Sequence, residues 1–184
     1  MNSGRIEQGE ISIRFCGIGG MGIILSSIIL GKAALYDNKN AIQTQSYGPE
    51  QRGTRVKSDI IIAEGELTSY PTESEVDILV AYSNDAYNFY SNQVKSLGSR
   101  FINSDLIKLE NIAAMTFPIP ANSIAQEFKN LKLVNIIMLG ALIKKTKLVS
   151  LNAIKKSISE SFPLRFIEIN LKALNAGYDF LKEN

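Results

Sequence analysis

The chain has 184 residues, of which 45% are hydrophobic and 21% charged, and its net charge is +2 at pH 7. These values are typical of one globular domain, exclude wholesale disorder and give no electrostatic reason to expect binding to nucleic acid. Histidine is absent and the single cysteine is Cys16. This chain therefore lacks the commonest general base, imidazole metal ligands and the four thiolates of an iron–sulfur cluster.

The first half of the chain predicts alternating strands and helices from the spacing of its apolar residues. Strands are expected over 11–16, 41–46, 55–63 and 76–81, and helices over 22–36 and 84–96. The polar segment 1–10 has no apolar run of signal-peptide length, and we expect it to be flexible. The longest apolar stretches, 22–30 and 134–143, reach about half of the roughly twenty residues of a membrane span. We therefore expect a cytoplasmic protein without a membrane segment.

The second half predicts two short strands followed by helices. The strands are expected over 100–103 and 114–117. Four helices are expected after them: a short helix capped by Ser123, an apolar helix over 134–146, a helix capped by Ser150 and a last helix over 166–182. The apolar helix suits either the core or an obligate interface. The whole pattern predicts one α/β domain over 1–184, with three layers (α/β/α) around a mostly parallel or mixed sheet.

A glycine motif follows the first predicted strand. Gly17, Gly19 and Gly22 have the G-x-G-x-x-G spacing, and Gly20 lies between them. Glycine allows positive φ and the close approach of a ligand, and the free N–H groups of a helix N-terminus attract anions. The same spacing also suits a plain strand-to-helix turn that needs small residues for packing, so both interpretations stay open.

A second distinctive loop separates the strands predicted over 41–46 and 55–63. It consists of Tyr47, Gly48, Pro49, Glu50, Gln51, Arg52 and Gly53. The Gly-Pro pair favours a fixed turn, from which opposite charges project. These charges suit the anionic and hydroxyl groups of a ligand, or they pair with each other or with a neighbouring subunit. If the strands are parallel, this loop, the glycine motif and the segment 82–85 share one edge of the sheet, where such sheets bind ligands.

The glycine motif matches the dinucleotide-binding fingerprint poorly. That fingerprint needs an acidic residue at the end of the second strand, about twenty residues after the glycines. Asp37 has the spacing but precedes the second predicted strand, whereas Glu50 follows that strand at a much longer spacing. A self-contained Rossmann-like nucleotide-dependent oxidoreductase, or a nucleotide-binding module, is therefore kept as the alternative function.

Several segments together resemble the gamma subunit of 2-oxoacid:ferredoxin oxidoreductases, in particular its 2-oxoglutarate:acceptor branch. They are G-I-G-G-M-G over 17–22, Q-T-Q-S-Y-G-P-E-Q-R-G over 43–53, V-D-I-L-V-A over 76–81 and N-I-I-M-L-G-A over 135–141. The resemblance extends roughly over 11–177. It departs from the family pattern at Thr54, where a second glycine is common, and at Met21, where glutamine is common.

The resemblance implies a fold like the gamma domain of pyruvate:ferredoxin oxidoreductase and a role in oxidative decarboxylation of a 2-oxoacid to acyl-CoA. The assembled enzyme would use thiamine diphosphate, Mg, iron–sulfur clusters and coenzyme A, none of them held by this chain alone. Its partners would be alpha, beta and delta-type subunits and, through the complex, ferredoxin or a similar acceptor. The isolated chain would be inactive and able to form a homodimer.

The resemblance assigns no catalytic or metal-binding residue to this chain. It implies that the two loops contact coenzyme A or neighbouring subunits. The residues expected at that contact are Gly17, Gly19, Gly20, Gly22, Tyr47, Gly48, Pro49, Glu50, Arg52 and Gly53.

Overall fold

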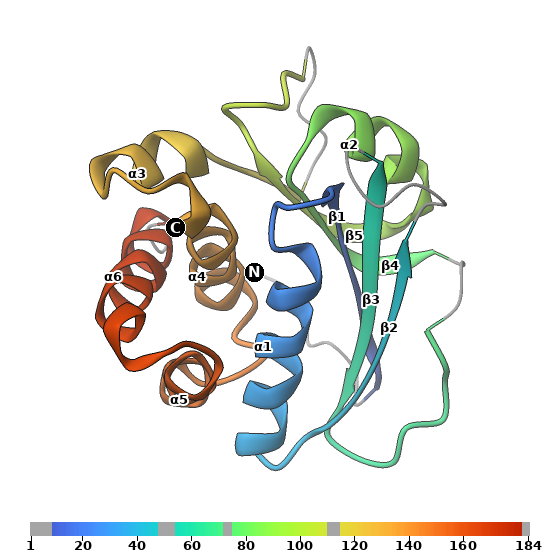
Figure 1. Ribbon diagram of the computed structural model, residues 1–184. Coiled ribbons are helices and arrows are strands. Elements are labelled where there is room, and N and C mark those ends of the chain that lie inside the picture. The colour runs from blue at the N-terminus through green and yellow to red at the C-terminus, as the bar shows by residue number, and fades with distance from the viewer. Residues whose placement is uncertain (1–8, 48–53, 72–74, 110–114, 182–184) are drawn as a thin grey trace, which may run out of the picture.

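A computed structural model of the chain describes residues 9–47, 54–71, 75–109 and 115–181 (Figure 1). Within these residues six strands form one sheet in the order β2-β3-β1-β4-β5-β6. The strands are β1 (Ile11–Ile18), β2 (Asn40–Tyr47), β3 (Arg55–Ala63), β4 (Val76–Ala81), β5 (Val94–Asn103) and β6 (Thr116–Ile119).

The sheet is mixed, within the range that the sequence predicts. β1 and β4, β4 and β5, and β5 and β6 pair in parallel, whereas β3 is antiparallel to both β1 and β2. β2 therefore runs in the same direction as β1. As a result, the carboxyl ends of β1, β2 and β4 lie at one edge of the sheet, as the sequence predicts for parallel strands.

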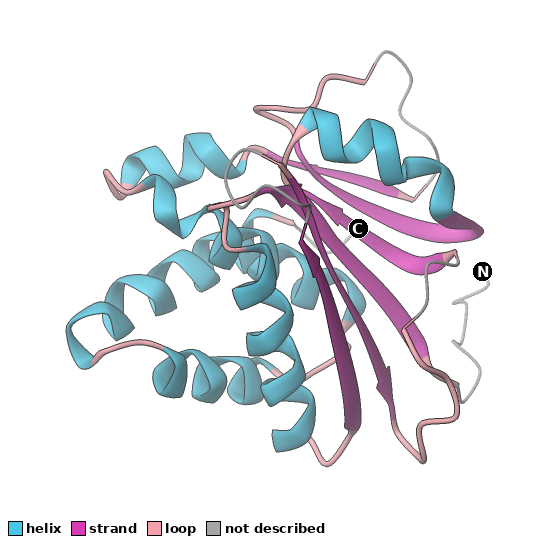
Figure 2. Cartoon of the chain, turned by 45° about the vertical axis from the view of Figure 1, so that its right-hand side comes forward, coloured by secondary structure: helices cyan, strands magenta, loops and turns pink. Residues whose placement is uncertain are grey.

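Helices cover the two faces of the sheet unequally. Those that gather on one face are α1 (Ile23–Tyr36), α3 (Ala121–Glu127), α4 (Val134–Thr146), α5 (Leu151–Ser161) and α6 (Leu164–Phe180). On the other face lies α2 (Asn84–Tyr90), continued by the short 3-10 helix η1 (Ser91–Gln93). A second 3-10 helix, η2 (Leu131–Leu133), leads into α4. Figure 2 shows the resulting three layers, with the sheet between the larger helical layer and α2.

Apolar side chains of the strands alternate between two clusters, as a strand period of two residues requires. Ile13 and Phe15 of β1 join the larger cluster on the side of α1 and α4, whereas Cys16 joins the smaller cluster under α2. In α4 every residue from Asn135 to Ile143 is buried. The apolar helix predicted over 134–146 is therefore a core element.

The backbones of α4 and α6 touch at two glycines. A Cβ placed on Gly140 would lie 2.1 Å from the Leu174 carbonyl oxygen, and one on Gly177 would lie 1.9 Å from the Ile137 carbonyl oxygen. Both distances are far below van der Waals contact, so this helix pair needs glycine at each position.

The predicted helix over 84–96 is too long. α2 ends at Tyr90, and Val94 already belongs to β5, where it pairs with Val76 of β4. The residues between them form the 3-10 turn. Burial of Val94 in the cluster under α2 favours the strand over continuation of the helix.

Two further boundaries need correction around β6. The strand predicted over 114–117 is found at Thr116–Ile119 and contains Pro118, which is tolerated because β6 is an edge strand. Ser123 does not cap α3, because Pro120 is its N-cap and Ser123 donates from its N–H and hydroxyl groups to Asp105. By contrast, the Ser150 side chain accepts from the Ala153 N–H group and caps α5 as predicted.

The last helix begins earlier than predicted. α6 starts at Leu164, directly after its N-cap Pro163; proline is pre-organised for such positions because its φ is fixed. None of the helices in the described ranges combines the length and hydropathy needed to cross a membrane.

Candidate functional site

The glycine turn connects the carboxyl end of β1 to α1 at the edge where β2 and β4 also end (Figure 1). Gly20 and Gly22 have φ of 97° and 75°, in the left-handed region that favours glycine. Gly22 is the N-cap of α1 and supplies no side-chain cap, and the first turn of the helix contains no acidic residue. The turn thus leads into a helix whose first turn carries no negative side chain.

The first two glycines of the motif have different roles. A Cβ on Gly17 would lie 2.7 Å from Ile23 Cδ1 and 3.1 Å from Tyr82 Cβ, so this position must be small for α1 to pack on β1. Gly19 donates its N–H to the Thr54 carbonyl oxygen at 3.2 Å. This bond attaches the glycine turn to the end of the second loop.

A buried tyrosine is linked by hydrogen bonds to the first turn of α1. The Tyr82 hydroxyl lies 3.0 Å from Ser26 Oγ, and Ser26 Oγ donates to the Gly22 carbonyl oxygen at 3.1 Å. Burial raises the pKa of the Tyr82 phenol well above its usual value, so the group stays protonated. This chain of hydrogen bonds fixes the N-terminus of α1 relative to the end of β4.

The second predicted loop begins and ends at the same edge. Tyr47 is the last residue of β2 and its backbone pairs with Val56 of β3, while Thr54 contacts Gly19. The Gly48, Pro49, Glu50, Arg52 and Gly53 predictions lie outside the described residues. The structure therefore attaches the Thr54 end of this loop to the glycine turn, whereas Tyr47 lies on the far side of β3 from β1.

The third segment of the edge, 82–85, leads into α2. Ser83 caps the helix by accepting from the Ala86 N–H group. The Arg55 guanidinium lies 4.1 Å from the centre of the Phe89 ring and 3.6 Å from Asp85 Oδ1. Phe89 is 52% exposed. An arginine stacked on an exposed aromatic ring is typical of a surface that contacts another molecule.

The sequence analysis missed Asn135 as a candidate site residue. This side chain is 4% exposed and lies in the first turn of α4. Its Nδ2 atom is 2.5 Å from where a Cβ on Gly22 would stand, so the amide packs directly against the glycine turn. The available signal was its presence in the segment 135–141 that resembles the family; its distance along the chain from the glycine motif concealed the contact.

Comparison with known proteins places this geometry in a family. A model of the pyruvate ferredoxin/flavodoxin oxidoreductase family matches residues 12–180. The chain belongs to this family. Subunit KorC of 2-oxoglutarate synthase from Methanocaldococcus jannaschii is 43% identical over 188 residues, an alignment that covers 100% of both chains.

Solved structures agree with this family assignment. The gamma subunit of a keto/oxoacid ferredoxin oxidoreductase from Geobacter sulfurreducens superposes with a TM-score of 0.81 at 36% identity, covering 92% of this chain and 96% of that one. A 2-oxoglutarate:ferredoxin oxidoreductase from Magnetococcus marinus gives a TM-score of 0.85 at 22% identity. It covers 97% of this chain but 32% of that chain, and shows that the same fold forms part of a longer polypeptide. The resemblance to the pyruvate ferredoxin/flavodoxin oxidoreductase family is thus confirmed over nearly the whole chain.

Asp37 has a structural role in this family member. Its carboxylate accepts from the N–H and hydroxyl groups of Ser150, and thereby ties the end of α1 to the start of α5. It lies at the opposite end of α1 from the glycine turn. The Rossmann-like alternative would need an acidic residue at the glycine edge, and Asp37 cannot supply it.

Cys16 is fully buried, and burial raises the pKa of its thiol far above the usual range. Such a thiol is neither a nucleophile nor a ready metal ligand. Within the described ranges, the acidic and cysteine side chains do not gather in groups of three or more that could hold a metal ion.

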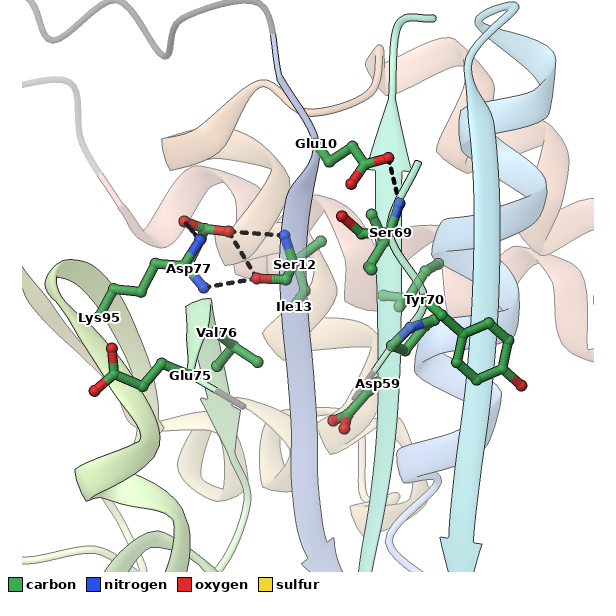
Figure 3. Close-up of a pocket in the computed structure, with 13 residues that line it drawn as sticks. Glu10, Ser12, Ile13, Asp59, Ser69, Tyr70, Glu75, Val76, Asp77 and Lys95 are labelled. Carbon is green, nitrogen blue, oxygen red and sulfur yellow. Dashed lines mark hydrogen bonds and ion pairs between the residues drawn. The ribbon is translucent and has the colours of Figure 1, made fainter. Parts of the chain in front are cut away.

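A cavity of about 350 Å³ opens at the other edge of the sheet, near the start of β1 and β4 (Figure 3). Three of the carboxylates that line it are engaged in hydrogen bonds or ion pairs. Asp77 accepts from Ser12 and Lys95, Glu10 accepts from Ser69, and Asp59 pairs with Arg14. The cavity is therefore stabilised by internal bonds and lies apart from the glycine turn.

Proposed function

We propose that this chain is the gamma subunit of a multi-subunit 2-oxoglutarate:ferredoxin oxidoreductase. The complex would decarboxylate 2-oxoglutarate oxidatively, form the acyl-CoA product and pass the electrons to ferredoxin or a similar acceptor. The observation that carries the proposal is the 43% identity to a 2-oxoglutarate synthase subunit, with both chains covered from end to end.

The residues of the chain fit a non-redox subunit. Thiamine diphosphate, Mg and the iron–sulfur clusters would be bound by alpha, beta and delta-type partner subunits, since clusters need thiolate ligands and the single thiol, Cys16, is buried. We propose that the glycine turn and the loop 47–53 contact coenzyme A or the neighbouring subunits. The exposed Phe89 with its stacked Arg55 extends this surface. We expect the assembled enzyme in the cytoplasm.

Affinity purification of the tagged chain from its native cell tests the proposal. The eluate should contain thiamine-binding and iron–sulfur subunits, and it should reduce a viologen dye when both 2-oxoglutarate and coenzyme A are present. Pyruvate in place of 2-oxoglutarate, and omission of coenzyme A, are the controls. Recovery of a single inactive chain would contradict the proposal, and a preference for another 2-oxoacid would reassign its branch.

A further inference from the structure

β2 is one edge of the sheet, and among the described residues no strand pairs with its outer side (Figure 1). It pairs with β3 residue by residue from Asn40 to Tyr47, without a shift of register. An edge strand carries a row of outward N–H and C=O groups, which proteins normally protect with charged residues, proline, bulges or short length. The eight residues of β2 include no charged residue and no proline. This edge is therefore able to pair with another strand.

The opposite edge of the sheet is protected. β6 has four residues, and one of them is Pro118. Proline donates no N–H group, and a short strand offers few groups to a partner. The contrast between the two edges indicates that the long and regular β2 is an interaction surface.

An apolar flank of α1 lies beside β2. Ser27 faces the strands, because its hydroxyl accepts from Gln43 Nε2 at 3.0 Å. Ser26 is turned toward β4, since its hydroxyl lies 3.0 Å from that of the tyrosine that follows this strand. Consecutive helical residues are rotated by about 100°, so Ile28 is turned the other way, toward the outer side of β2. Leu35 shares this flank, and the two side chains are 37% and 58% exposed.

A second copy of this chain satisfies both features at once. A two-fold axis at the edge pairs β2 with its own copy in antiparallel orientation, about 4.8 Å away. α1 lies against both β2 and β3, so the two α1 helices run two strand spacings, or about 10 Å, apart. Helices in contact pack about 8–10 Å apart. An isolated extended segment would cover the edge of β2 but would bring no second helix to the flank of α1.

We propose that two copies of this chain associate through β2 and join their sheets into one, with the two α1 helices side by side. The bond from Gln43 to Ser27 sets these residues level with each other, so pairing centred on Gln43 brings Ile28 next to Ile28 of the second copy. A two-fold axis places residues near their own copies, where like charges would repel. β2 and the apolar flank of α1 carry no charge at this contact, and the surface is therefore self-complementary.

Sedimentation equilibrium of the full-length chain measures the association, and we expect a monomer–dimer equilibrium. Ile28→Glu places two carboxylates opposite each other and should weaken the dimer roughly tenfold or more. Gln45→Lys, an exposed change on β2, should weaken it as well, because lysine protects edge strands from pairing. Phe166→Glu on α6, where the side chain is 42% exposed, is the matched control and should leave the dimer unchanged. A wild-type chain that is monomeric at about 0.1 mM, or a dimer insensitive to either β2-side variant, would overturn the proposal.

Amide hydrogen exchange tests the strand pairing without a substitution. The amides of β2 should exchange several-fold more slowly at high chain concentration than at low concentration, because pairing gives its outward N–H groups a partner. The amides of α6 should not respond to concentration. Equal exchange of β2 at both concentrations, in a chain that sediments as a dimer, would place the contact on another surface and overturn the proposal.

Cross-linking identifies the occupant of the edge. Ile28→Cys introduces an accessible thiol into a chain whose single cysteine, Cys16, is fully buried, and a short bismaleimide should then join two copies of the chain. Phe166→Cys is the control and should give no such product. In a complex purified with partner subunits, a product that joins the Ile28→Cys chain to a different subunit would overturn the second copy as the occupant. Failure to dimerise leaves the proposed function intact, because co-purification with partner subunits tests that function separately.

Discussion

Arg14 and Asp59 form a bidentate ion pair between β1 and β3, with both nitrogen–oxygen distances at 2.7 Å. The two residues are 0% and 4% exposed. The guanidinium also donates to the Gln93 side-chain oxygen and lies 5.2 Å from the centre of the Tyr90 ring. Burial alone lowers the pKa of Arg14, but the hydrogen bonds and charge of Asp59 outweigh it and hold that pKa above its usual value. The buried cation therefore depends on its partner.

Asp59→Asn is expected to destabilise the protein strongly. It removes the carboxylate that pairs with the buried Arg14 charge, a change that typically costs about 3–5 kcal/mol of the free energy of unfolding. Urea unfolding of the purified chain measures the loss. Asp85→Asn is the control, because its ion pair with Arg55 is exposed and worth less than about 1 kcal/mol. Equal losses in the two variants would refute the role given to the buried pair.

Gly140→Ala should destabilise the chain because the new Cβ would overlap the Leu174 carbonyl oxygen. Backbone atoms cannot rotate away as a side chain can, so α4 and α6 must separate. We expect a loss of about 3 kcal/mol or more, at the upper end for overpacked cores. Thermal unfolding is the measurement. Gly65→Ala, where a Cβ would meet no atom within 4 Å, should change stability little, and a comparable loss there would show that the effect is not steric.

The lowered pKa of Asp77 predicts that the stability of the folded protein depends on pH. Burial raises its pKa, but hydrogen bonds from Lys95 and from the hydroxyl and N–H groups of Ser12 outweigh this and lower the pKa below its usual value. A carboxylate with a lowered folded-state pKa stabilises the fold above its unfolded pKa, near about 3.9, and loses this contribution as pH falls through the folded value.

We therefore expect the free energy of unfolding to decrease as pH falls below about 4. Asp77→Asn should remove part of that decrease, so that wild type and variant differ most near neutral pH and converge in acid. Urea unfolding over a pH series provides the comparison, with the exposed Asp179→Asn as the matched control. Parallel curves for wild type and Asp77→Asn would exclude this linkage.

Cys16 is expected to be inert in the folded protein. Its side chain is 0% exposed and burial raises the pKa of the thiol, so neither reagent access nor thiolate is available. An aromatic disulfide reagent should release no coloured product from the native chain and one equivalent per chain in guanidinium chloride. Rapid labelling without denaturant would mean that α2 lifts from the sheet.

Arg52→Ala is expected to raise the KM of the assembled enzyme for coenzyme A about tenfold, the magnitude of a lost hydrogen bond to a charged group. The KM for the 2-oxoacid should be unaffected. Steady-state viologen reduction measures both constants, and Arg165→Ala, an exposed position on α6, is the control. An unchanged KM for coenzyme A would remove Arg52 from the site.

The elements that carry the site could be predicted from local sequence. The boundaries of β3 and α4 coincide with the predicted ranges, because long apolar runs with clear ends specify them. The G-x-G-x-x-G spacing also predicts the strand, turn and helix at Gly17–Gly22 correctly. The spacing of apolar residues and the residue types of a turn are local properties of the sequence, and they suffice to predict strands, turns and helices such as these.

Tertiary contacts explain what the sequence does not reveal. The early end of α2 depends on the pairing of Val94 with Val76, and the packing of Asn135 joins it to Gly22, which is far away in the chain. No local pattern reveals that this asparagine packs against the glycine turn. The loop residues Glu50 and Arg52 remain predictions.

The glycine contact between α4 and α6 has a consequence for folding of the protein during its synthesis. α4 carries Asn135 in its first turn and packs against Gly177 of α6, a helix that is synthesised after α4 and α5. A nascent chain that has emerged only as far as α5 contains the whole glycine turn but lacks the helix that holds Asn135 in place. The contact of α4 with the glycine turn can therefore reach its final geometry only after α6 has been synthesised.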